Sequence, residues 1–180
     1  VEYVTISSIG NAADFGNLTV ARHGPAGLSS NTRGLIGGGA TPGLSDVIDY
    51  VTISSVGDFT DFGNLSVARS QSAGANSTTR GVFAGGDQPS ISNVIQYVTI
   101  ASTGNTQDFG DLTQARSKQA EASNNTRGVF SGGQSPTLRN TMDYITIAST
   151  GDAQDFGDGS GPLRNGVGYC SDSHGGLGGF

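Results

Sequence analysis

The sequence predicts an all-β fold of the β-propeller type, and three observations lead to that prediction. A unit of 47 residues recurs along the chain, each unit carries four short strand-like segments, and no segment has the apolar spacing of an amphipathic helix. Short strands that begin about every 8–12 residues are typical of sandwiches, barrels and propellers. A constant period of roughly 40–50 residues with four strands per period favours the propeller among these.

Three motifs define the repeat, and each recurs at an interval of 47 residues. They are a tyrosine within a β-branched segment, an Asp-Phe-Gly triplet and a Thr-Arg-Gly triplet. The tyrosines are Tyr3, Tyr50, Tyr97 and Tyr144; the first triplet begins at Asp14, Asp61, Asp108 and Asp155, and the second at Thr32, Thr79 and Thr126. The chain is therefore interpreted as one domain, 1–180, made of the repeats 1–46, 47–93, 94–140 and 141–180.

Four strands, a to d, are expected in each repeat. Strand a is a small-residue stretch, and strand b is an apolar run closed by two glycines. Strand c is rich in β-branched and aromatic residues, and strand d is the short segment around Asp-Phe-Gly. The third has apolar residues on both faces, which indicates a position between neighbouring sheets. In the copy that begins at Thr79 they are strand b at 80–84, closed by Gly85 and Gly86, strand c at 94–100, strand d at 108–112, and the following strand a at 118–123.

The phase of the repeat predicts how the blades close. The sequence starts inside a c strand and ends at a b strand, so it reads c,d, three complete sets of a,b,c,d, and a final a,b. We expect the N-terminal c,d strands to join the C-terminal a,b strands, which gives a closed propeller of four blades of four antiparallel strands. The alternative is an arc of a larger ring, with further copies preceding this sequence or supplied by another subunit.

The order of these features resembles the kelch repeat. In the kelch pattern a double glycine, a tyrosine, a tryptophan and an arginine follow one another; this sequence departs from it by having Phe in place of Trp. The amino-acid sequence of the repeat is also similar to kelch-like repeats of marine bacteriophage and bacterial proteins. The resemblance implies the propeller fold. It rests on Gly38, Gly39, Tyr50, Phe62 and Arg69 in one copy, Gly85, Gly86, Tyr97, Phe109 and Arg116 in the next, and Gly132, Gly133, Tyr144 and Phe156 in the third.

The composition argues against several classes of function. The formal net charge is −6, 13% of the 180 residues are charged, and no basic stripe is present, so nucleic acid is not an expected partner. No apolar run approaches the ~20 residues of a membrane-spanning helix, which argues against membrane insertion. Cys170 is the single cysteine, so neither an internal disulfide nor a Cys-based metal cluster is expected. We expect no metal and no cofactor.

The Asp-Phe-Gly triplets are interpreted as architectural. The same triplet holds magnesium in protein kinases, but here it occurs in every repeat, without a glycine-rich loop, a strand lysine or a catalytic loop. We expect its aspartates to tie a turn and its phenylalanines to pack between blades. Cys170 and His174 are also interpreted as structural, so no catalytic residue is assigned.

The arginines recur in two sets, one inside the Thr-Arg-Gly triplets and one after strand d. Since other charges are few, both sets are interpreted as partners of the repeated aspartates or of backbone carbonyls. In the alternative interpretation, a ring of these arginines surrounds a channel and holds an anion or an acidic sugar. Strand direction alternates, so the d–a and b–c connections share one face, and the b–c connections differ between copies. The candidate ligand-binding residues on this face are Arg22, Arg69, Arg116, Gln88, Ser90 and Thr137.

The function predicted from these observations is non-enzymatic binding, outside a cell or on a virion surface. Polar, weakly charged repeats with equivalent sites fit multivalent recognition of a glycan or a cell-surface receptor. The alternative is a structural module for decoration or assembly, whose faces contact a protein partner, copies of itself or a larger appendage. Repeated Arg, Tyr or Asn side chains in solvent-filled pockets would favour the first function, and an exposed apolar patch the second.

Overall fold

The computed structural model describes residues 1–87 and 89–162. These residues contain sixteen strands, β1 to β16. All strand pairings among these residues are antiparallel. The predicted all-β fold is therefore confirmed for them. The same residues contain no helix with the length and hydropathy needed to span a membrane.

Three four-stranded sheets follow one another along the chain. In each, the small-residue strand a and the Asp-Phe-Gly strand d are the two edges, so the four strands expected per repeat are confirmed. Sheet 1 contains β3 (Ala26–Ser29), β4 (Arg33–Gly37), β7 (Val47–Thr52) and β8 (Thr60–Asn64); sheet 2 contains β9 (Ala73–Asn76), β10 (Arg80–Ala84), β11 (Val94–Thr99) and β12 (Gln107–Asp111); sheet 3 contains β13 (Ala120–Ser123), β14 (Arg127–Ser131), β15 (Thr141–Thr146) and β16 (Gln154–Asp158).

Two smaller strand pairs accompany these sheets. β1 (Glu2–Tyr3) and β2 (Ala13–Asp14) pair with each other and correspond to strands c and d of a repeat. β5 (Ala40–Thr41) and β6 (Gly43–Leu44) form a hairpin inside the b–c connection of sheet 1. In sheets 2 and 3 isolated bridges take the place of this hairpin. The b–c connections therefore differ between repeats, as the sequence predicted.

The Asp-Phe-Gly triplet forms a β-bulge in strand d of all three sheets. In sheet 2 the shift in pairing makes Phe109 the extra residue between Asp108 and Gly110 on β12. A bulge bends its strand and redirects side chains, so the repeated triplet has a structural cause. The corresponding extra residues are Phe62 in sheet 1 and Phe156 in sheet 3.

The phenylalanine of strand d packs against the next sheet, as the sequence predicted. Phe62 of sheet 1 shares a core cluster with Ile100 of sheet 2, and Phe109 of sheet 2 shares one with Ile145 and Ile147 of sheet 3. Phe62 and Phe109 are each 2% exposed. Because the apolar cores lie between the sheets, each sheet is stabilised by burial against its neighbours.

The aspartate and the glycine of the triplet differ in how regularly they contribute to the structure. Asp155 accepts a hydrogen bond from Gly157 N at 3.1 Å, the turn contact that was expected, but the other three aspartates make no such bond to described residues. The glycine permits close approach: Gly63 adopts φ of +146°, and a Cβ there would lie 2.3 Å from the carbonyl oxygen of Gly104 in the next repeat. Glycine is therefore required at this position by both conformation and space.

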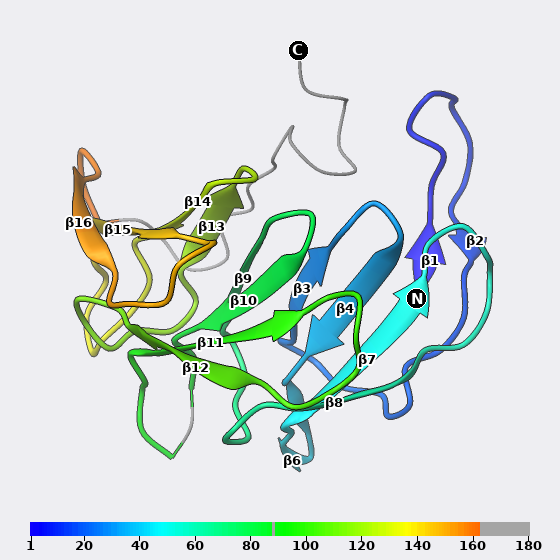
Figure 1. Ribbon diagram of the computed structural model, residues 1–180, viewed down its shortest axis with the longest axis horizontal. Coiled ribbons are helices and arrows are strands. Elements are labelled where there is room, and N and C mark those ends of the chain that lie inside the picture. Colours follow the sequence, from blue (N-terminus) through cyan, green and yellow to red (C-terminus); the bar gives the residue numbers. More distant parts are fainter. Residues whose placement is uncertain (88, 163–180) are drawn as a thin grey trace.

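The sheets are arranged side by side through their a strands (Figure 1). β9 lies between β3 and β13, because Asn76 donates its side-chain amide to Ser29 O on one side and its backbone N–H to Ser123 Oγ on the other, at 3.2 Å for the second bond. The remaining strands of each sheet extend away from this row of a strands.

Closure of the sheets into a ring stays a prediction. Its C-terminal strands fall on residues 163–180, which lie outside the described residues. The β1–β2 pair and β16 lie at opposite sides of the molecule in Figure 1, with sheets 1 and 2 and the rest of sheet 3 between them. The order of neighbours in space is thus β1–β2, sheet 1, sheet 2 and sheet 3, the same as their order in the sequence.

Candidate functional site

The three arginines predicted to bind a ligand have their side chains inside the molecule. Arg69 and Arg116 are 0% exposed, and the side chain of Arg22 is also fully buried. Each lies on a d–a connection and contacts the b and c strands, or the residues next to them, of the sheet that follows; Arg69 Nη1 donates to Gly85 O at 2.9 Å and to Val94 O at 3.3 Å. This placement agrees with the interpretation of the arginines as partners of backbone carbonyls. It gives no support to a ring of guanidinium groups that faces a channel.

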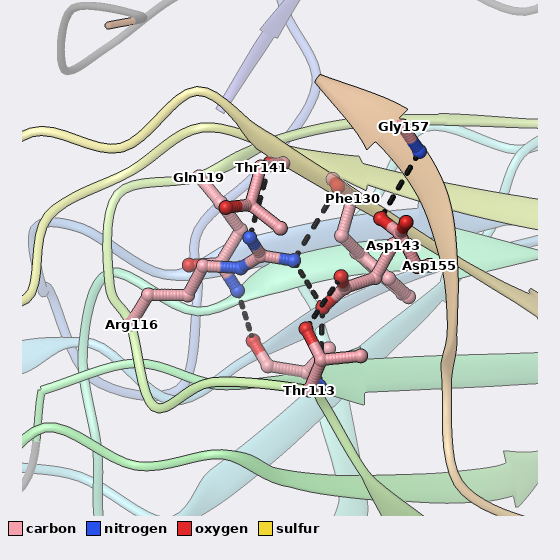
Figure 2. A network of polar contacts seen from close by, with 9 residues as sticks. Thr113, Arg116, Gln119, Phe130, Thr141, Asp143, Asp155 and Gly157 are labelled. Carbon is pink, nitrogen blue, oxygen red and sulfur yellow. Dashed lines mark hydrogen bonds and ion pairs between the residues drawn. The ribbon is translucent and has the colours of Figure 1, made fainter. Parts of the chain in front are cut away.

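Arg116 also has a carboxylate partner (Figure 2). Its Nη2 lies 2.5 Å from Asp143 Oδ2, and Asp143 Oδ1 accepts a hydrogen bond from Thr113 Oγ1 at 2.7 Å. Arg22 forms the corresponding pair with Asp49 at 3.0 Å. Both aspartates lie on strand c directly after the register shift, where Asp143 pairs with Asp155 and Asp49 with Asp61. The sequence analysis did not single out these two aspartates.

In sheet 2 a glutamine, Gln96, occupies the position of these aspartates. Its Oε1 accepts hydrogen bonds from Ser66 N at 2.8 Å and from Thr106 Oγ1 at 2.5 Å. Among the described residues, its Nε2 and the Nη2 of Arg69 are buried without a partner. Burial without a nearby carboxylate lowers the pKa of Arg69 to about 10. Burial also lowers the pKa of Arg116, but there the charge of Asp143 opposes the shift.

The other three candidate residues belong to b–c connections. Ser90 and Thr137 are exposed, and Gln88 lies outside the described residues. Isolated bridges join the d–a and b–c connections, for example between Ser70 and Asp87 in sheet 2. The predicted common face of these connections is therefore confirmed. The structure separates the six candidates, since the arginines are internal while Ser90 and Thr137 are accessible.

A repeated hollow, which the sequence analysis did not assign, lies at the c–d turn of each sheet. The tyrosine of strand c, the turn itself and the start of strand d line it. The cavity volumes are about 160 Å³ in sheet 1, 130 Å³ in sheet 2 and 220 Å³ in sheet 3. The hollows are related by the 47-residue repeat, so they are three equivalent sites. Their tyrosines are Tyr50, Tyr97 and Tyr144.

An arginine and a phenylalanine hold the tyrosine in place. In sheet 2, Cζ of Arg80 lies 4.3 Å from the ring centroid of Tyr97, and the Phe109 ring meets Tyr97 edge-on with centroids 6.0 Å apart. Arg80 comes from the Thr-Arg-Gly triplet, and its Nη1 donates to Ile147 O of the next sheet at 2.9 Å. The cation–π contact and the edge-to-face contact both restrict the ring. The hollow therefore has a preorganised aromatic wall.

Polar groups complete the wall of each hollow. Tyr97 Oη donates to Gln107 Oε1 at 2.6 Å in sheet 2, and Tyr144 Oη donates to Gln154 Oε1 at 2.5 Å in sheet 3. Serine and threonine hydroxyls of the turn, which both donate and accept hydrogen bonds, lie beside them. A glutamine ten residues after the tyrosine, in two successive repeats, is the sequence signal that points to this site.

In residues 1–87 and 89–162 no group of three His, Cys, Asp or Glu side chains is placed to hold a metal ion. A comparison of the chain with protein-family models and with curated proteins finds no match. Function is therefore inferred from the geometry of the repeated hollow.

Proposed function

We propose that this chain is a kelch-like propeller module that binds neutral glycans, without catalysis, outside a cell or on a virion surface. The proposal rests on one observation: a tyrosine-containing polar hollow occurs three times at equivalent positions. The side-by-side sheets, joined through their a strands, support the propeller part of the proposal (Figure 1). In this fold β1 and β2 supply the c and d strands of a further blade.

The size and the chemistry of the hollows fit a single sugar ring. Their volumes lie below the roughly 300–1,000 Å³ of pockets for drug-sized ligands. The tyrosine ring offers apolar surface to the C–H groups of a sugar, while hydroxyl and amide groups offer hydrogen bonds to its hydroxyls. Asp58 lines the hollow of sheet 1, and in sheet 3 the charges of Asp152 and Arg127 offset each other, so none of the three hollows carries the excess positive charge that would favour an acidic sugar over a neutral one.

Repetition compensates for weak binding at each site. A shallow hollow of this size buries little of its ligand, so we expect weak affinity for an isolated sugar. A glycan with several branches, or a surface that displays many copies, engages two or three hollows at once. Linked binding of this kind raises the overall affinity by roughly 10²–10⁴ without any new contact.

A glycan array with three forms of the protein tests this proposal. In the first variant, Ser55→Trp, Ser102→Trp and Ser149→Trp fill the hollows; all three serines are exposed turn residues that line them. The matched control carries Ser90→Trp and Thr137→Trp on the exposed b–c connections. We expect the wild type and the control to bind the same glycans, and the filled variant to lose that binding while its circular dichroism spectrum is unchanged.

Two results would contradict the proposal. Loss of binding in the control but not in the filled variant moves the site to the face of the b–c and d–a connections. If folded wild-type protein binds none of the glycans on the array, a glycan is excluded as the ligand.

A further inference from the structure

The two ends of the row of sheets expose apolar residues whose equivalents are buried at the two junctions between sheets 1, 2 and 3. Phe156 in sheet 3 is 49% exposed, although Phe62 at the same position of sheet 1 is 2% exposed. On the turn after β1, Ile6 is 87% exposed; its equivalent in sheet 1, Ile53, is 44% exposed, and Ile100 in sheet 2 is 1% exposed. Repeat arrays need polar terminal faces to stay soluble as single molecules, and exposed apolar patches mark interaction surfaces. These ends have the composition of internal junctions.

A fixed set of hydrogen bonds joins each unit of the row to the next. Between sheets 1 and 2, Phe62 O accepts from Gly104 N at 2.7 Å, and Asn64 O accepts from Thr106 N at 2.9 Å. Asn64 N donates to Asn105 Oδ1 at 3.0 Å. The same three bonds join Phe15 to Gly57, Asn17 to Phe59 and Asn17 to Asp58 before sheet 1, and Phe109 to Gly151, Asp111 to Ala153 and Asp111 to Asp152 between sheets 2 and 3.

β16 presents one half of this set without a partner among the described residues. Phe156 and Asp158 occupy the positions of Phe62 and Asn64. Gly157 keeps the φ of +128°, yet a Cβ on it would meet nothing within 4 Å. At the corresponding glycines of the three described junctions, a Cβ would lie 2.2 to 2.5 Å from the carbonyl oxygen of the next turn; these are Gly16, Gly63 and Gly110. The end of sheet 3 thus has the shape that elsewhere receives a neighbour.

Arg127 shows the same difference between the end and the interior. Arg33 Nη1 donates to Ile100 O at 3.0 Å, so this arginine reaches from sheet 1 to sheet 2. Arg127, at the equivalent position of sheet 3, stacks on Tyr144 with Cζ 4.5 Å from the ring centroid. Arg127 is exposed, and its guanidinium donates no hydrogen bond to a described residue. Its guanidinium is therefore available to a carbonyl of a neighbouring unit.

The turn between β1 and β2 presents the complementary half. Gly10, Asn11 and Ala12 are exposed and occupy the positions of Gly104, Asn105 and Thr106. By analogy with the internal junctions, Gly10 N matches Phe156 O and Ala12 N matches Asp158 O. The Asn11 side-chain oxygen matches Asp158 N. All groups of the junction are thus present, divided between the two ends of one chain.

We propose that β16 of one copy of this chain binds the β1–β2 hairpin of a second copy, through the contacts that join neighbouring sheets within the chain. A second copy is favoured over the chain's own hairpin because β1–β2 and β16 lie at opposite sides of the molecule (Figure 1). The intervening junctions are held by the same repeated bonds, so no one of them is a hinge. Head-to-tail contacts of this kind form rings of copies where the rotation between copies closes, and open filaments where it does not. The contact adjoins the hollow of sheet 3, because Arg127 also lines that hollow.

Cross-linking between differently labelled copies tests the proposal directly. Asn11→Cys and Asp158→Cys are made in separate chains, each with Cys170→Ser to remove the native thiol. At an internal junction the equivalent residues, Asp152 and Asp111, are joined by a hydrogen bond of 3.0 Å. We expect the mixed chains to form a disulfide-linked dimer under mild oxidation, at a rate well above that of either chain alone. A chain that carries both cysteines and cross-links within itself, as a monomer, would overturn the proposal.

The mass in solution gives a second readout. We expect wild-type protein to have a mass of two or more chains by light scattering, and Ile6→Lys to have the mass of one chain. Val67→Lys is the matched control, because Val67 is 45% exposed on a d–a connection away from both ends; it is expected to keep the wild-type mass. A wild type that stays at one chain up to millimolar concentration, without cross-linking in the mixed sample, would refute the contact.

Discussion

Arg116 and Asp143 form an ion pair at 2.5 Å in which both side chains are completely buried (Figure 2). Arg22 and Asp49 repeat it in sheet 1, but sheet 2 has Gln96 opposite the buried Arg69. The three sheets therefore offer a comparison inside one molecule between a buried arginine with a carboxylate and one without.

Gln96→Asp is expected to stabilise the protein by about 1–3 kcal/mol, since it gives the buried Arg69 a charged partner. The substitution also removes the buried Gln96 Nε2, which has no partner among the described residues. An aspartate at this position is already accommodated by the same backbone in sheets 1 and 3. Urea denaturation should show a higher midpoint with an unchanged slope.

The variant Gln96→Asn is the control for that experiment. Gln96→Asn shortens the side chain as Asp does but supplies no charge, so it is expected to be neutral or destabilising. Equal gains from Gln96→Asn and Gln96→Asp would show that side-chain length, and not the ion pair, is responsible.

Asp143→Asn is expected to destabilise the protein by about 3–5 kcal/mol, because it leaves Arg116 charged and buried without its partner. The matched control is Asp155→Asn, an exposed aspartate of the same sheet, for which we expect a change within about 0.5 kcal/mol. The free energies of unfolding of the two variants are compared under identical conditions. A small cost at Asp143 would mean that Thr113 and the surrounding carbonyls satisfy Arg116 without the charge.

The strands were predictable from the sequence because their signals are local. The segment 94–100 combines β-branched and aromatic residues in an unbroken run, and the observed β11 is Val94–Thr99. The 47-residue period carries that assignment to the other copies, including strand a, whose own small-residue signal is weak. The phenylalanine of strand d was also predictable, since an apolar residue repeated in a polar segment needs a neighbour to cover it.

The direction of the repeated arginines was not predictable, because it depends on tertiary structure. The sequence shows that an arginine follows strand d, but whether it faces a channel or the sheet depends on where the accepting carbonyls lie in space. In the structure Arg69 donates to Gly85 O, directly after β10, and to Val94 O at the start of β11, a carbonyl that also accepts from Gly85 N. The tyrosine hollow was missed for a similar reason, since its walls come from a turn whose shape the sequence does not specify.

Gly85→Ala is expected to destabilise the protein by more than about 1 kcal/mol. Gly85 has φ of +62°, a conformation that costs an L-residue roughly 1–2 kcal/mol, and a Cβ there would lie 2.4 Å from Arg116 O. Gly43→Ala is the control, because Gly43 has nothing within 4 Å of its Cβ position. Thermal unfolding of both variants measures the difference, and a similar melting temperature for the two would show that the double glycine is not needed for close approach.

Glu121 is expected to make stability fall as the pH rises through neutrality. It lies on β13, at the position that Gly27 and Gly74 occupy in the other sheets, and burial raises the pKa of its carboxyl from 4.5 to about 7. A hydrogen bond from the Gly74 backbone opposes the shift only partly. Because the folded state holds the proton more tightly than the unfolded state, the stabilising contribution is complete below about pH 4.5 and is lost as the pH passes through about 7.

Glu121→Gln should remove this dependence, since the amide stays neutral in both states. We expect the free energy of unfolding of the variant, relative to wild type, to increase between pH 5 and pH 8, as measured by urea denaturation at each pH. Glu2→Gln, at an exposed glutamate on β1, is expected to show a constant difference over the same range. If the Glu121→Gln difference is also constant, the Glu121 carboxyl is ionised in the folded protein throughout, and its burial is relieved by contacts with solvent.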